Sequence, residues 1–259
     1  MRFILGLLLL GGAVGVCAAE AAPKDDGVVW ASEPAGKAQW QLDVAQLRQA
    51  RSGVILPGYL HTEEVAWGRY HDPGVYALKD GREMNVSLNG WKWEQVNAWP
   101  KGKKLFLCYD EARGATLLDP ETKRWLIVRH IWDPNGKFVH PIADYVESLH
   151  PGSTYDIMSA HQEAERLWKL EIDRSVREVL ALKHLPKDVR AGFIALTKTR
   201  LEYCRTQLAF GGAAIHADIT GTAAGPMTGD YAASLYRDAF EHLSKVSEAY
   251  LAFDRPPEK

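Results

Sequence analysis

The spacing of apolar residues changes near the middle of this 259-residue chain, and this change restricts the fold more than any other feature. From Pro73 to Ile131, short β-type runs alternate with turn-forming residues, as in consecutive strands. From Tyr155 onward, apolar residues recur every three or four positions, as on one side of an α-helix. The sequence therefore predicts an α+β protein with a β-meander domain at 73–150 and a three-helix domain at 153–253.

Short connections between the predicted strands indicate antiparallel neighbours in a meander of about six strands, curled into a sheet or small barrel. The clearest local signal is Asn89-Gly90, which accepts the positive φ angles of a tight turn and predicts a hairpin between 84–88 and 91–96. On its second strand, Trp91 and Trp93 would share one face. Further strands are expected at Val75–Leu78, Lys104–Tyr109, Ala115–Leu118 and Arg124–Ile131.

Three long helices with apolar stripes are expected in the C-terminal half. The first ends before Pro186, which can begin the second, and Gly211-Gly212 are expected to end that second helix. A loop rich in glycine, alanine and threonine then reaches Gly229, after which the third helix begins. The stripes should pack as an antiparallel hairpin with a covering helix.

Residues 1–19 have the order of a secretion signal: Arg2, an apolar stretch at 3–16, then small residues. We expect cleavage near Ala19 and a periplasmic or secreted protein, with lipid attachment at Cys17 as the alternative. No later stretch reaches the length of a transmembrane helix. Residues 20–72 carry weak signals, apart from an amphipathic helix expected at 39–51.

The charge balance argues against a nucleic-acid partner. The formal net charge is −2, and removal of Arg2 with the signal would change it to −3. Such a chain lacks the basic surface that binds phosphates. A protein partner is expected instead.

Cleavage would leave Cys108 and Cys204 as the mature cysteines. An even pair in an oxidising compartment favours a disulfide between them. Two buried free thiols are the alternative.

The sequence contains none of the common motifs for a serine nucleophile, a zinc protease or a phosphate-binding loop. Its nine histidines are scattered, so no enzymatic activity, metal or cofactor is expected. One alternative is a cell-envelope hydrolase that uses scattered histidines and acids; another is a structural module of an envelope complex. The groups considered for chemistry are His61 with Glu64, His71 with Asp72, and His161 with Glu163 and Glu165.

Nine tryptophans suggest either a binding surface for sugars or proteins or a core rich in large rings. The candidate binding aromatics are Trp91, Trp93 and Trp99. A small sheet domain needs large side chains to fill its core, so the alternative for Trp91 and Trp93 is that both are core residues.

The stretch Leu196-Thr197-Lys198-Thr199-Arg200-Leu201-Glu202-Tyr203-Cys204 resembles the signature helix of the lysozyme inhibitor LprI-like family, in which an arginine precedes a cysteine by four residues. A long polar helix before it, Gly211-Gly212 after it, and a last helix bearing Arg237 continue the similarity over about 155–251. The family's other cysteines are absent, so Cys204 could pair only with Cys108. The resemblance implies a bacterial envelope protein that binds and inhibits a lysozyme without catalysis of its own. An anionic inhibitor would be steered toward cationic lysozymes.

Overall fold

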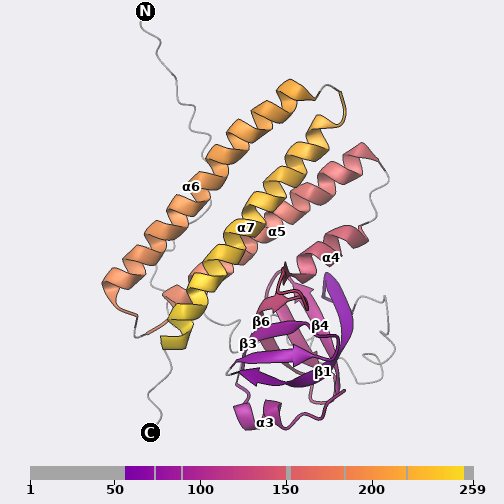
Figure 1. The fold of residues 1–259 in the computed structure, drawn as a ribbon, viewed down its shortest axis with the longest axis vertical. Coiled ribbons are helices and arrows are strands. Elements are labelled where there is room, and N and C mark those ends of the chain that lie inside the picture. Colours follow the sequence, from indigo (N-terminus) through magenta and orange to yellow (C-terminus); the bar gives the residue numbers. More distant parts are fainter. Residues whose placement is uncertain are drawn as a thin grey trace, which may run out of the picture.

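The computed structural model describes residues 56–72, 74–88, 90–149, 153–183, 185–219 and 221–253. An antiparallel β-barrel is followed by a layer of long helices (Figure 1). The predicted α+β class is therefore confirmed. The signal segment 1–19, with Cys17, and the helix predicted at 39–51 lie outside the described residues.

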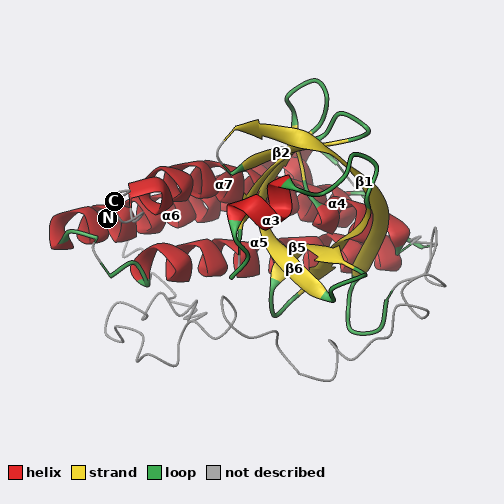
Figure 2. Ribbon diagram, turned by 90° about the horizontal axis from the view of Figure 1, so that it is seen from below, coloured by secondary structure: helices red, strands yellow, loops and turns green. Residues whose placement is uncertain are grey.

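The barrel is closed because β3 pairs with β6 in addition to the neighbours in the strand order β3-β2-β1-β4-β5-β6. Both sides of all six strands are thus paired, and the short seventh strand pairs with the end of β6. Figure 2 shows the curved strands around α3. The strands are β1 (His61–Asp72), β2 (Val75–Leu78), β3 (Glu83–Ser87), β4 (Lys104–Asp110), β5 (Gly114–Asp119), β6 (Arg124–Trp132) and β7 (Phe138–Val139).

Strand β1 lies in the segment where the sequence signals were weak, so the sheet begins earlier than the expected position near Pro73. Its first half pairs with β4 and its second half with β2. The register shifts around Gly68, where an added Cβ would lie 2.5 Å from the carbonyl oxygen of Ala77. The missing side chain lets the two backbones approach at this bulge, and β1 can pass from one partner to the other.

The hairpin predicted at Asn89-Gly90 is wrong in its second strand. β3 pairs with β2 and β6, and the chain then forms the short helix α3 (Trp93–Asn97) at the end of the barrel away from the long helices (Figure 1). The Gln95 side chain accepts a hydrogen bond from the Lys92 backbone N–H at 3.0 Å. Buried Val96 anchors α3 in the core. Gly90 has a φ of 79°; Asn89 lies outside the described residues.

The other predicted strands are present as β2, β4, β5 and β6. The helices are α4 (Pro141–Ser148), which the sequence did not predict, α5 (Thr154–Leu180), α6 (Lys187–Asp218) and α7 (Ala224–Phe253). α7 lies between α5 and α6 (Figure 1). Among the described residues, no helix combines the length and the apolar character that crossing a membrane requires.

Gly211-Gly212 do not end α6, and the long loop expected up to Gly229 is wrong. α6 continues to Asp218 and α7 begins at Ala224. A Cβ on Gly211 would lie 2.4 Å from the Tyr231 ring, so this glycine permits close contact between the two helices. The pair of glycines serves packing and does not stop the helix.

The barrel and the helices share one continuous core. Its members include Leu126 from β6, Trp168 from α5 and Phe240 from α7. A smaller apolar cluster, with Phe106 and Trp125, lies separately. The change near residue 150 is thus a change of element type within a shared core.

Candidate functional site

The free end of the helical layer exposes large apolar side chains. We define the helical tip as residues 153–161 at the start of α5, 207–219 at the end of α6 and 224–231 at the start of α7, which lie far from the barrel (Figure 1). At the tip, Phe210 is 80% exposed, Tyr155 76% and Met227 47%. Exposed large apolar side chains near the ends of three neighbouring helices make this end of the layer a candidate interaction surface.

The charged residues of the helical tip are acidic. Asp156, Asp218 and Asp230 lie there, and its three segments contain no lysine or arginine. The nearest basic side chain along α6 is Arg205, which pairs with Glu202 at 3.3 Å. The tip therefore offers apolar anchors in a negative field, which suits a cationic partner.

Close helix contacts hold the helical tip in place. Gly225 and Gly229 of α7 approach Met158 and His161 of α5: a Cβ on them would lie 2.8 Å from the methionine sulfur and 3.0 Å from the histidine Cβ. Ser153 and Asp156 form a capping box at the start of α5. Tyr155 of α5 and Met227 of α7 thus belong to two closely packed helix ends.

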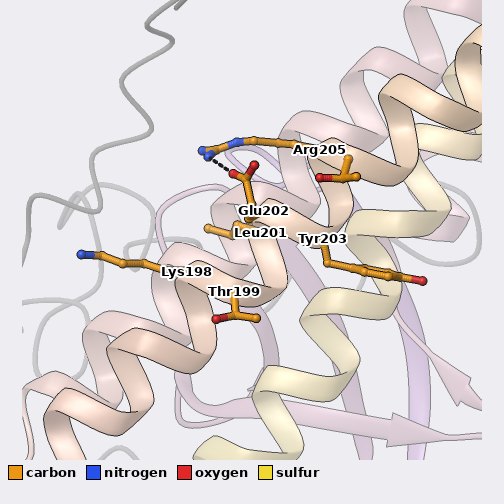
Figure 3. Close-up of a pocket in the computed structure, with 7 residues that line it drawn as sticks. Lys198, Thr199, Leu201, Glu202, Tyr203 and Arg205 are labelled. Carbon is orange, nitrogen blue, oxygen red and sulfur yellow. Dashed lines mark hydrogen bonds and ion pairs between the residues drawn. The ribbon is translucent and has the colours of Figure 1, made fainter. Parts of the chain in front are cut away.

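The helix of the family motif is the outermost, α6. Figure 3 shows Lys198, Glu202 and Arg205 on its outer face, whereas the half-exposed ring of Tyr203 points to the other side of the helix. A shallow hollow lies over this face, but its lining residues all belong to α6, so α6 alone does not enclose a ligand. The hollow is a part of the surface rather than a binding pocket.

The motif residues Arg200 and Cys204 turn away from that outer face. The Cys204 sulfur lies 3.5 Å from the Leu235 carbonyl oxygen of α7, and the Arg200 guanidinium lies 5.5 Å from the centre of the Tyr203 ring. Cys204 therefore helps to pack α6 against α7, whereas Arg200 contacts Tyr203 of its own helix.

The predicted disulfide is wrong, because Cys108 and Cys204 are both free and buried. Cys108 belongs to the small apolar cluster with Phe106 and Trp125, whereas Cys204 faces α7. The barrel strand β4 and the outer helix α6 lie in different parts of the molecule (Figure 1). Burial raises the pKa of both thiols, which keeps them protonated and unreactive.

The candidate binding tryptophans lie at the α3 end of the barrel. The Trp99 ring stands edge-on to Trp91, with ring centres 5.3 Å apart, and Trp93 stacks on Tyr76 at 6.0 Å. Trp91 is buried and carries the Arg124 guanidinium over its ring at 4.1 Å. Trp91 is thus a core residue, while Trp93 and Trp99 are only partly covered.

The groups considered for catalysis do not converge. His61 and His71 lie near opposite ends of β1, up to roughly 33 Å apart for an extended strand. Glu64 pairs with Lys104 at 2.9 Å and His71 with Glu83 at 2.8 Å. The side chain of Asp72 is not described.

The third of these groups is divided in the same way, because Glu163 pairs with Arg166 and Glu165 with Lys169 on α5. His161 lies 3.8 Å from Asp230 of α7. Over the described parts of the chain, no group of histidine, cysteine and acidic side chains could hold a metal ion.

Sequence spacing could not reveal one polar cluster, because its members come from β6 and α7. The Ser244 hydroxyl oxygen lies 3.0 Å from His130 Nε2, and His130 Nδ1 pairs with Glu248. This hydrogen-bond order is that of a serine-hydrolase triad. Ser244 is only 4% exposed, however, and also donates to the Glu241 carbonyl. Ser244 lies within α7, where the backbone N–H groups donate to carbonyl oxygens of the helix itself. These N–H groups are therefore not available to stabilise the oxyanion that a hydrolase forms during its reaction.

A second polar network joins the barrel to α5. The Tyr109 hydroxyl donates to Glu171 at 2.9 Å, Arg174 pairs with Glu171, and Arg174 also donates to the Glu111 carbonyl oxygen at 2.5 Å. These interactions fix the orientation of the helical layer on the barrel.

Buried His140 lies beside this network, with its ring 5.5 Å from Tyr109 and 5.0 Å from Trp168. Burial lowers the pKa of His140 to about 3, so its ring is neutral near pH 7. Its Nδ1 accepts a hydrogen bond from the Ile142 backbone N–H at 3.3 Å. The neutral ring therefore carries its proton on Nε2.

No protein-family model, curated protein or solved structure matches the chain. The resemblance to the LprI-like family thus rests on the motif residues alone.

Proposed function

We propose that this chain is an exported, non-enzymatic binding protein of the bacterial cell envelope that inhibits a lysozyme through the helical tip. The observation that carries the proposal is Phe210, an aromatic side chain on α6 that is 80% exposed. Buried aromatic anchors supply much of the binding energy in protein interfaces, and an exposed one is available to act so. The motif on α6 supports the choice of partner.

The charge of the helical tip agrees with that partner. Asp156, Asp218 and Asp230 lie in the same three segments as the apolar anchors, and these segments contain no lysine or arginine. A cationic lysozyme would be steered toward such a surface, and high salt would slow its association. Binding would then depend on contacts at the tip and on no chemical step.

Substitution of Phe210 tests the proposal. We expect Phe210→Ala to weaken binding to the inhibited lysozyme at least about tenfold, as for an interface anchor. Its melting temperature should not change, because the side chain is exposed. Tyr70→Ala is the control, since Tyr70 is 43% exposed but lies on the barrel. Binding should be measured by calorimetry against purified lysozymes of several classes.

Two results would contradict the proposal. One is that no class of lysozyme is bound or inhibited by the wild-type protein. The other is that Phe210→Ala and Tyr70→Ala both inhibit as the wild type does, which would exclude the helical tip as the binding surface.

The second candidate function is hydrolysis, favoured by the contact between Ser244 and His130. A fluorophosphonate probe reacts with an activated serine hydroxyl. Under the binding proposal, Ser244 stays unlabelled because it is buried. Labelling that is lost in Ser244→Ala and in His130→Ala would instead establish the hydrolase.

A further inference from the structure

A cleft of about 160 Å³ lies between the barrel and the helices, at the junction of β7, α4, α5 and α7. Three of its lining side chains are buried rings, which provide an apolar floor. Three others carry charge. The rings are Phe138, His140 and Trp168, and the charged residues are Lys137, Asp144 and Arg237.

Arg237 is the most informative member of the cleft. Its Nε is buried and has no hydrogen-bond acceptor within the described part of the chain. Among the described ion pairs, none includes Arg237; Glu241, one turn further along α7, pairs with Lys245 instead. A buried guanidinium N–H without an acceptor is costly unless a ligand or water supplies one.

The remaining polar groups define what such a ligand would contain. Lys137 adds a second positive charge, and neutral His140 carries its proton on Nε2 and can donate. A guanidinium fork matches the two oxygens of a carboxylate. Asp144, on α4, offers a negative charge that could accept from an amino group.

We propose that this cleft binds a small carboxylate through Arg237 and Lys137, with its apolar part against the Trp168 ring. A volume of about 160 Å³ is below the range of drug-sized sites and suits a molecule the size of a small amino acid. Asp144 favours α-amino acids over simple acids, because only they bring an amino group. The site lies at the junction with the barrel, apart from the helical tip, and does not depend on lysozyme binding.

Two-dimensional NMR of the wild-type protein tests this directly, with the Trp168 indole N–H as the reporter. Alanine, propionate and isopropylamine are the probes, since they share a similar size but differ in charged groups. We expect saturable shifts of the Trp168 signal with alanine, weaker saturation with propionate and none with isopropylamine. A site with even these few polar contacts should bind alanine with a dissociation constant below about 10 mM. The absence of saturable shifts up to about 10 mM alanine would therefore overturn the proposal.

Variants assign the charges. Arg237→Gln should weaken carboxylate binding at least tenfold, whereas Arg205→Gln, on the outer face of α6, should leave it unchanged. Asp144→Asn should lower the affinity of the cleft for alanine to its affinity for propionate. Arg237→Lys keeps the positive charge but loses the two-pronged guanidinium group. Its affinity for the carboxylate should therefore lie between those of the wild type and Arg237→Gln. Unchanged alanine binding in folded Arg237→Gln would refute the assignment.

Discussion

In the barrel, backbone hydrogen bonds fix how closely neighbouring elements approach, whereas in the helical layer the approach depends on side chains that can move. A Cβ on Gly68 of β1 would meet the backbone of β2, but a Cβ on Gly211 of α6 would meet the ring of Tyr231. A glycine is therefore harder to replace in the barrel, at Gly68, than in the helical layer, at Gly211. In the barrel the spacing is thus set by backbone contacts, and in the helical layer, which carries the exposed tip, it is set by side-chain contacts.

The junction between these halves contains two polar networks. Tyr109, Glu171 and Arg174 form one network, and His130 with Glu248 and Ser244 forms another. Buried polar groups stabilise an orientation only when every member has a partner. The junction should therefore be more sensitive to substitution than either half alone.

The largest effect is expected for Glu171→Ala, which leaves the buried Arg174 without its carboxylate and Tyr109 without its acceptor. Removing one partner of a buried ion pair typically destabilises a protein by about 3–5 kcal/mol. Glu163→Ala on the same helix is the control, because its pair with Arg166 is exposed and should contribute at most about 1 kcal/mol. Urea unfolding measures both; similar losses would mean that the junction is solvated.

The next effect is expected for Gly68→Ala, which tests the rigidity of the barrel. The new Cβ would lie 2.5 Å from the Ala77 carbonyl oxygen, and the paired backbones of β1 and β2 cannot separate without losing hydrogen bonds. We expect a loss of about 1–3 kcal/mol or more, as for overpacked cores. A stability equal to wild type by urea unfolding would show that β1 is not tightly held at the bulge.

Several elements could be predicted because their signals are local. β2, β4, β5 and β6 follow from apolar runs bounded by turn residues, and the long helices follow from their stripes. β1 was missed because it bends at Gly68 between two partners, which no local pattern records. The turn at Asn89-Gly90 misled the prediction, since β3 pairs with β2 before it and with the distant β6 rather than with the residues that follow the turn.

Sites formed by distant residues could not be predicted. Ser244 meets His130 across 114 positions of the chain, and the cleft around Arg237 draws on four elements. The tryptophans were recognised from composition, but only the fold shows that Trp91 is buried. The error over Cys108 and Cys204 has the same origin, because sequence contains no Cα separation.

Acid should weaken the junction through His140. The folded-state pKa of about 3 lies below the unfolded value near 6.5, so the unfolded state binds the extra proton between these values. Stability is then fully present above about pH 6.5 and falls as the pH drops toward 3, by up to about 1.4 kcal/mol per pH unit from this group. His140→Asn can still cap α4 and should flatten the pH profile of urea midpoints. An unchanged profile would exclude His140 as the acid-sensitive group.

The smallest effect separates two glycines of α6 and bears directly on the difference between the halves. Gly192 has open space around it, so Gly192→Ala should stabilise the helix by about 0.5–1 kcal/mol. Gly211→Ala gains the same helix propensity but pushes the Tyr231 ring aside and disturbs its 3.4 Å hydrogen bond to Gln207. Because that ring can move, we expect the gain in helix propensity and the cost of displacing the ring nearly to cancel in Gly211→Ala. The Gly211→Ala variant should then be less stable than Gly192→Ala by about 1 kcal/mol. A loss at Gly211 as large as that of Gly68→Ala would show that the α6–α7 contact is as rigid as the barrel, and equal gains at Gly192 and Gly211 would show that the glycines do not set the helix approach.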